Sequence, residues 1–119
     1  MRVGALARQT GMTRDTIRFY ERRGLISSRP SQDPSNSYRD YPDDTVDRLD
    51  MIAQARDAGM SIAELEVLVR VMETGDLETF DADRFLAGKI AEIKASIERS
   101  KRFVAVLEAT RKALSRAVQ

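Results

Sequence analysis

The sequence predicts a mainly α-helical protein with one short β-hairpin, and three observations carry this prediction. Apolar residues recur every three or four positions along most of the chain, which is the period of an amphipathic helix. Residues 27–42 break that period with prolines and other turn-forming residues, so a hairpin or loop interrupts the helices there. From about residue 86 to near the end, apolar residues follow a heptad spacing, which is typical of a coiled coil.

Length and hydrophobicity limit the size and the location of the protein. The chain has 119 residues, of which 42% are hydrophobic, and this is enough for one modest core. It contains no run of eighteen apolar residues, so we expect no membrane-spanning helix. The first apolar position follows Met1 within two residues, which leaves no room for a signal peptide. We therefore expect a cytoplasmic protein.

The chain contains neither cysteine nor histidine, and this excludes several kinds of chemistry. Disulfides, thiolate nucleophiles, imidazole bases and the usual ligands of zinc, copper and iron are all absent. Only carboxylates remain as metal ligands, and their spacing does not resemble a calcium loop. We expect no metal site, no cofactor and no enzymatic activity.

Charge is distributed unevenly along a nearly neutral chain. The net charge is +1, but residues 1–42 hold eight arginines against four acidic residues, which is a net +4. The remaining residues carry 12 basic and 15 acidic side chains, a net −3. A basic N-terminal third indicates a phosphate-bearing partner such as a nucleic acid.

Two short helices joined by a tight turn are expected at the N-terminus. Residues 4–10 predict a first helix with Leu6 and Ala7 facing inward, and Gly11 and Met12 form the turn. The second helix begins after Thr13, whose side chain can cap the free backbone amides, and ends at a glycine, residue 24. This pair is typical of a helix-turn-helix, whose second helix lies in the major groove of DNA.

The second helix carries an arginine face. Arg14, Arg18 and Arg22 lie four residues apart and share one side, while Ile17 and Tyr20 share another. Three like charges in register repel one another in water, so the arrangement favours a polyanionic partner. A solvated surface face is the alternative interpretation for the arginines, and core packing is the alternative for Tyr20.

The segment after this helix predicts a wing, that is, a hairpin beside the recognition helix. We expect residues 25–26 and 38–41 to pair as short strands around a loop. Tyr38 and Tyr41 fall on opposite faces of such a strand. One of them then packs inward, and the other, with Arg39, reaches the DNA backbone or minor groove. A plain linker is the alternative.

Two further helices complete a predicted DNA-binding domain of residues 1–75. Residues 43–58 predict a helix with a core stripe, and Gly59 ends it. Ser61 and Glu64 have the spacing of a capping box at the start of the next helix, which ends at Gly75. The expected core residues are Val46, Leu49, Ile52 and Ala53 in one helix and Ile62, Leu65, Leu68, Val69 and Met72 in the other.

Residues 76–119 predict a connector and a coiled-coil dimerisation helix. Asp81 can cap a helix that starts at about residue 82 and spans on the order of 50 Å at about 1.5 Å per residue. Eight of ten heptad positions are apolar, and nothing else in the chain is left to cover them, so we expect a homodimer. The seam runs through Leu86, Ile90, Ile93, Ile97, Ser100, Val104, Leu107, Arg111, Leu114 and Val118; its expected dimer contacts are Ile90, Ile93, Ile97, Ser100, Val104, Leu107 and Leu114.

Taken with these elements, the sequence resembles the MerR family of transcriptional regulators over about its first 72 residues. The most specific motif is Thr-Ile-Arg-Phe-Tyr-Glu at residues 16–21, and the others, in the order of the family, lie at residues 3–7, 10–12, 24–26, 36–41 and 59–65. The resemblance implies a winged-helix dimer joined by an antiparallel coiled coil on a palindromic promoter operator. It further implies that the regulator bends and untwists a promoter with a long spacer so that RNA polymerase can use it.

The resemblance also implies particular DNA contacts. Arg18 and Tyr20 would contact DNA from the helix, and Arg39 and Tyr41 from the wing. Helix geometry adds Arg14 and Arg22 to these. The full set of predicted DNA-binding residues is Thr13, Arg14, Thr16, Arg18, Tyr20, Arg22, Arg39 and Tyr41.

The chain departs from the family in its sensor chemistry. Many members have metal-binding or redox cysteines beside the dimerisation helix, and this chain has none, which excludes thiolate metal sensing, an iron–sulfur switch and cysteine-based aldehyde sensing. An inducer then either binds a small apolar site or does not exist, unless the chain is a fragment of a longer regulator. The least polar candidates for such a site, which ordinary packing also explains, are Met72, Leu77, Phe80 and Phe85.

Three functions remain open at this point. The first is a sequence-specific, homodimeric regulator of bacterial transcription that acts on double-stranded promoter DNA together with RNA polymerase. The second is an architectural or excision-type protein that bends DNA. The third is a protein-interaction module whose basic face is incidental.

Overall fold

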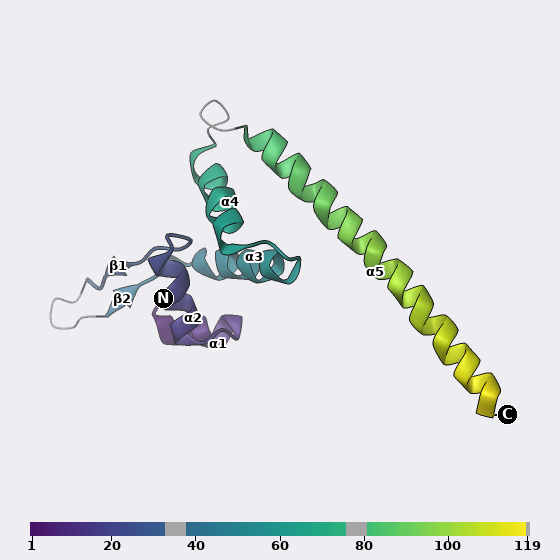
Figure 1. Cartoon of the computed structure of the whole chain (residues 1–119). Helices are drawn as coiled ribbons and strands as arrows, with labels where there is room; N and C mark the ends of the chain where they lie inside the picture. The colour runs from purple at the N-terminus through teal and green to yellow at the C-terminus, as the bar shows by residue number, and fades with distance from the viewer. Residues whose placement is uncertain (33–37, 76–80, 119) are drawn as a thin grey trace. The chain divides into compact units, whose positions relative to one another are not determined.

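The computed structural model describes residues 1–32, 38–75 and 81–118 and divides the chain into two compact units, Met1–Gly75 and Asp76–Gln119. The first unit holds four helices and a two-stranded antiparallel hairpin among its described residues, and the second holds one long helix (Figure 1). The mainly helical class predicted from the sequence is confirmed. The elements are α1 (Val3–Thr10), α2 (Arg14–Arg22), β1 (Arg29–Pro30), β2 (Arg39–Asp40), α3 (Thr45–Asp57), α4 (Ile62–Thr74) and α5 (Ala82–Val118).

The helix-turn-helix forms as local chemistry predicts. Gly11 ends α1 with φ +74°, a left-handed conformation that favours glycine. The Thr13 side chain accepts a hydrogen bond from the backbone N–H of Thr16 at 3.1 Å and so caps α2. Helix α1 packs against α2 and α3, and α3 packs against α4. The first unit is therefore arranged around α1 and α3, with the hairpin projecting from the helices (Figure 1).

One apolar core fills the first unit. Leu6 and Ile17 from the helix-turn-helix meet residues of α3 and α4 there. Burying an aliphatic side chain of this size contributes about 1.5–3 kcal/mol, so this cluster dominates the stability of the unit. The largest fully buried side chains are Leu6, Ile17, Leu25, Leu49, Ile52 and Leu65.

The predicted first strand of the wing was placed wrongly. Leu25 and Ile26 are buried core residues, and the Leu25 N–H donates to the carbonyl of Tyr20, as in the closing turn of a helix. A strand would turn one of two neighbouring side chains to solvent, whereas the core accepts both. The observed strand begins later, in a hairpin with the register Arg29↔Asp40 and Pro30↔Arg39.

Helices α3 and α4 differ in how they begin. The Asp44 side chain makes no capping hydrogen bond at the start of α3. At α4 the predicted capping box is present: the Glu64 N–H donates to Ser61 Oγ at 3.1 Å, and the Ser61 N–H donates to Glu64 Oε1 at 2.9 Å. Met72 was expected in the core but is 53% exposed, because it lies near the C-terminal end of α4.

Helix α5 is a single helix of 37 residues. Asp81 Oδ1 accepts a hydrogen bond from the backbone N–H of Arg84 at 3.0 Å, so the predicted N-terminal cap is present. Within the described ranges, no helix combines the length and the apolar character needed to cross a bilayer.

Candidate DNA-binding surface

The arginines of α2 lie at different places on the first unit. Arg14, Arg18 and Arg22 are all exposed. The Arg18 side chain is about half exposed, and its nearest carboxylate, that of Asp15, is 4.0 Å away on an almost fully exposed side chain. Such a pair contributes little in water, so Arg18 is available to a phosphate or a base.

Arg14 and Arg23 contact other helices. A Cβ atom placed on Gly4 of α1 would lie 3.0 Å from Arg14 Nη2, so the absence of a side chain at Gly4 leaves room for this guanidinium. Arg23 pairs with Glu66 of α4, with Nη2 2.5 Å and Nε 2.7 Å from Oε1. Arg14 nevertheless remains exposed, so the basic face of α2 comprises Arg14, Arg18 and Arg22.

The two threonines at the start of α2 form one local cap. Thr13 is exposed, Thr16 is half-buried, and the Thr13 hydroxyl lies 2.9 Å from that of Thr16. This arrangement holds the first turn of the recognition helix. Both threonines remain predicted DNA contacts.

Tyr20 packs in the core. Its side chain is buried with Ile17 and Leu25, and its ring lies 5.7 Å from that of Phe19. Of the two interpretations of Tyr20, the structure supports core packing. The ring is 8% exposed, and a DNA contact from Tyr20 stays a prediction.

In the wing, the structure buries Tyr41 and exposes Tyr38. Tyr38 is 58% exposed, and the Arg2 guanidinium carbon lies 4.2 Å from its ring centroid. Tyr41 is only 4% exposed, and its hydroxyl donates to Glu21 Oε1 at 2.6 Å. Burial and the hydrogen bond to Glu21 raise the pKa of Tyr41 to about 12. Tyr38 is the outward tyrosine, and the DNA contact from Tyr41 stays a prediction.

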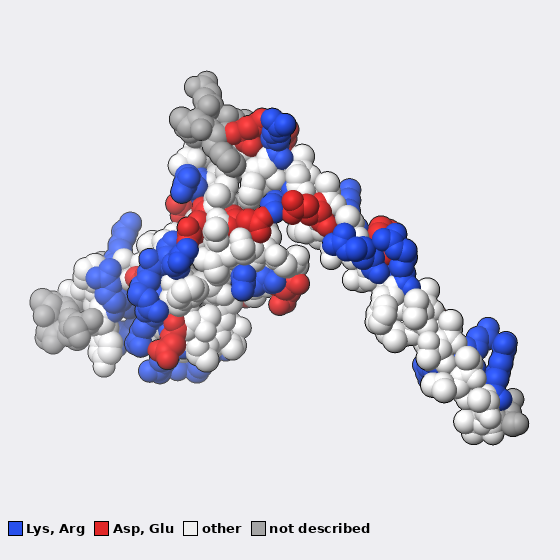
Figure 2. Space-filling model, viewed as in Figure 1, with Lys and Arg blue, Asp and Glu red and all other residues white. Residues whose placement is uncertain are grey.

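Three arginines line a hollow between the wing, α2 and the N-terminus, which we call the arginine notch. Arg2, Arg18 and Arg39 surround a volume of about 280 Å³ together with Val3, Tyr38 and Tyr41. Basic side chains gather over this part of the first unit (Figure 2). Planar guanidinium groups match the geometry of phosphate oxygens, so the arginine notch suits a backbone phosphate.

Sequence reasoning missed Arg2 as a site residue. The charge count of the N-terminal third included it, but only the three-dimensional fold brings it beside the wing. The backbone makes this contact: the Tyr41 N–H donates to the carbonyl of Met1 at 2.7 Å.

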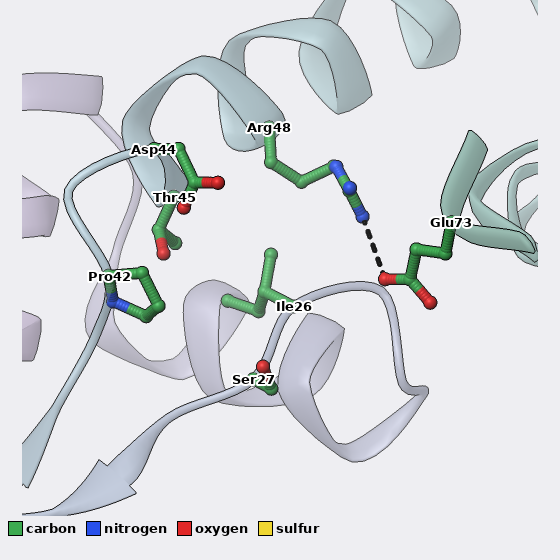
Figure 3. Close-up of a pocket in the computed structure, with 7 residues that line it drawn as sticks. All are labelled: Ile26, Ser27, Pro42, Asp44, Thr45, Arg48 and Glu73. Atoms are coloured by element: carbon green, nitrogen blue, oxygen red, sulfur yellow. Dashed lines mark hydrogen bonds and ion pairs between the residues drawn. The ribbon is translucent and has the colours of Figure 1, made fainter.

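A second hollow of about 200 Å³ lies at the base of the wing (Figure 3). Arg48 spans it, donating from Nη1 to Glu73 Oε1 at 3.3 Å and to the carbonyl of Leu25 at 3.2 Å. The hollow is lined by Ile26, Ser27, Pro42, Asp44, Thr45, Arg48 and Glu73, and it is polar rather than apolar.

This polar hollow does not coincide with the expected apolar effector site. Of the four candidates for that site, Met72 is exposed and Phe85 is half-buried, whereas Leu77 and Phe80 lie outside the described residues. Positions 36 and 37 of the motif at residues 36–41 also lie outside them. Within the part of the chain that the structure describes, no cluster of three or more acidic residues could hold a metal ion.

The predicted dimer contacts lie on an unpartnered stripe of α5. Five of them (Ile90, Ile97, Val104, Leu107 and Leu114) are between 49% and 63% exposed; Ile93 is half-buried and Ser100 is exposed. Two exposed apolar residues that the heptad pattern did not include, Phe103 and Val106, lie in the same half of the helix as Leu107. They widen the apolar surface of α5 beyond the predicted seam.

The chain is similar to proteins of one family of regulators. Residues 1–71 match the family model described as MerR HTH family regulatory protein, and residues 46–116 match the one described as MerR, DNA binding. The mercuric resistance operon regulatory protein of Bacillus cereus is 35% identical over 106 residues, which cover 89% of this chain and 79% of that protein. The HTH-type transcriptional regulator CueR of Escherichia coli O6:H1 is 34% identical over 98 residues, covering 82% and 71%.

Among solved structures, the fold is similar to that of HiNmlR, described as a MerR family regulator lacking the sensor domain, bound to promoter DNA. The TM-score is 0.75 at 21% identity, with 92% of this chain and 85% of that chain covered. The family models and relatives favour a transcriptional regulator over an architectural or excision-type protein. The chain belongs to the MerR family of DNA-binding transcriptional regulators.

Proposed function

We propose that this regulator works as a homodimer on a palindromic promoter operator, with each first unit binding one half-site. The observation that carries the proposal is the arginine notch, where Arg18 of the recognition helix and Arg39 of the wing meet Arg2. Phosphate contacts of this kind fix the register of a protein on DNA, and the adjacent recognition helix then reads the bases.

The exposed stripe of α5 supports the homodimer. A helix with apolar residues at heptad spacing gains stability when a second helix covers that stripe. Two copies related by a two-fold axis place two recognition helices on DNA in opposite directions, which is the symmetry of a palindrome. Each subunit then contributes one arginine notch and one α2.

We further propose that the dimer acts by distorting promoter DNA for RNA polymerase. This step rests on the family resemblance and on the wing. A protein that contacts the DNA backbone on both sides of a half-site can stabilise bent DNA. The deformation energy then depends on the sequence being bent. Transcription in vitro from the promoter, with and without the protein, measures this step.

The replacement of Arg18 tests the DNA-binding surface. Arg18→Ala should weaken binding to the promoter of the chain's own gene by about 1–3 kcal/mol if Arg18 reads a base. Arg102→Ala, which removes the same charge from an exposed position of α5, is the matched control and should change binding little. A gel shift in which the wild-type protein binds the promoter no more tightly than random duplex contradicts the proposal.

A further inference from the structure

A carboxylate on the recognition helix is unexpected on a surface that binds phosphate. Glu21 lies in the last turn of α2, three residues after Arg18, and its negative charge repels DNA unless another group engages it. The structure engages both of its oxygens. Tyr41 donates to Oε1 at 2.6 Å, and the Ser28 hydroxyl donates to Oε2.

The same serine continues the chain of contacts to the wing arginine. Arg39 Nε donates to Ser28 Oγ at 2.9 Å, and Arg39 Nη2 donates to the Ser28 carbonyl at 3.0 Å. Among the described residues, no carboxylate lies within ion-pair distance of Arg39. We call these four residues, Glu21, Ser28, Arg39 and Tyr41, the Glu21 network.

We propose that Glu21 is a positioning residue that fixes the wing to the recognition helix, so that Arg39 faces the same phosphate as Arg18. This inference rests on the proposed DNA-binding function. Hydrogen bonds to an ionised carboxylate are short and strong, which suits them to hold a two-stranded hairpin that is marginal on its own. The raised pKa of Tyr41 agrees with a hydroxyl committed to Glu21.

Simple electrostatics predicts the opposite effect of Glu21 on DNA affinity. Removing a negative charge from a DNA-binding helix should strengthen attraction to phosphate. If Glu21 instead positions Arg39, then Glu21→Ala should weaken operator binding about tenfold, the scale of one lost phosphate or base contact. Asp15→Ala is the matched control, because Asp15 is an exposed carboxylate on the same helix, and it should leave binding unchanged or strengthen it.

A double-mutant cycle with Arg39 separates positioning from a general loss of structure. Glu21→Ala should cost almost no further affinity in the background of Arg39→Ala, since the group that it positions is already gone. Both single variants should lower the slope of log affinity against log salt by about one. A merely destabilised fold would not produce this coupling or this shared salt signature.

Ser28→Ala tests the same inference if Glu21→Ala does not fold. It removes the hydroxyl that links Glu21 to Arg39 but keeps the hydrogen bond from Tyr41 and the one from Arg39 to the backbone carbonyl of residue 28, so operator affinity should fall, though by less than in Arg39→Ala, while thermal unfolding changes little. Additive losses from Glu21→Ala and Arg39→Ala, or an unaltered affinity of Ser28→Ala, contradict this inference alone. A wild-type protein that does not prefer the operator to random duplex contradicts the proposed function as well.

Discussion

The two units of this chain differ in the exposure of their apolar side chains. In the first unit, leucines and isoleucines from helices α1 to α4 and from the segment after α2 meet in one core, and six of them are fully buried. In α5, residues of the same kinds lie at heptad positions and remain about half exposed. The first unit completes its core from its own chain, whereas α5 presents a surface that a second helix can cover.

This difference separates two contributions to operator binding. The recognition helix, the wing and the arginine notch all belong to the first unit, so affinity for a half-site is a property of one chain. Joining two half-site binders converts the second contact into an intramolecular one, which strengthens binding without any new contact.

A charge in the α5 stripe should have the largest effect. Leu107→Glu places a carboxylate at an apolar seam position that is 54% exposed in the single chain. If the seam joins two chains, the dimer dissociates and operator affinity falls by about 10²–10⁴, the range that linking two binding units supplies. Sedimentation measures the assembly state, and a gel shift on the full operator measures the affinity.

Ala109→Glu is the control for that variant. It introduces the same charge into the same helix, but on the side away from the seam at about 100° per residue. It should remain a dimer with nearly wild-type affinity. If Leu107→Glu behaves like Ala109→Glu, the α5 stripe does not hold the dimer.

Loss of a core side chain in the first unit should have the next largest effect, now on stability. Leu49→Ala empties a fully buried position of α3 and should lower the free energy of unfolding by about 2–5 kcal/mol. Leu114→Ala in α5 removes the same atoms from an exposed position. Urea denaturation at several protein concentrations distinguishes them: the loss from Leu49→Ala should be present at every concentration, and the loss from Leu114→Ala should follow dimer dissociation.

Local chemistry explains why much of the fold could be predicted from the sequence. The caps at Thr13, Ser61 and Asp81 each involve residues no more than three positions apart, and all three form as expected. The glycine that ends α1 and the heptad spacing of α5 are local signals of the same kind. Such features depend on the chain within one or two turns and little on its packing elsewhere.

The site could be predicted only in part, because its details depend on contacts between distant segments. Alternation in a strand places Tyr38 and Tyr41 on opposite faces, but it does not indicate which of the two is buried. Tyr41 is the buried one, and its hydroxyl bonds to Glu21, twenty residues earlier in the chain. Arg2 enters the notch because the backbone of Met1 pairs with that of Tyr41. Leu25 is not part of a strand, because its side chain packs in the core.

The smallest expected effect concerns alkaline pH and only the first unit, which holds all three tyrosines of the chain. The pKa of Tyr41 is raised to about 12 in the folded protein, against about 10 in an unfolded chain, so folding favours the neutral hydroxyl. Its contribution to stability is complete below pH 10 and is lost as the pH rises toward 12.

Comparing Tyr41→Phe with the wild type measures this contribution. The variant should be less stable near pH 8 and should show a weaker decline in stability between pH 10 and 12, as followed by urea denaturation. Tyr38→Phe, at an exposed ring, controls for the loss of a hydroxyl. Parallel declines in the wild type and in Tyr41→Phe would show that Tyr41 is not the group responsible.

A hydroxyl-radical footprint on the promoter of the chain's own gene tests the central claim most directly. Two first units held by one α5 pair should protect two half-sites related by a two-fold axis, with centres separated by whole turns of the double helix. Leu107→Glu should reduce protection of both half-sites together. Protection of a single half-site, or equal protection on random DNA, would contradict the account.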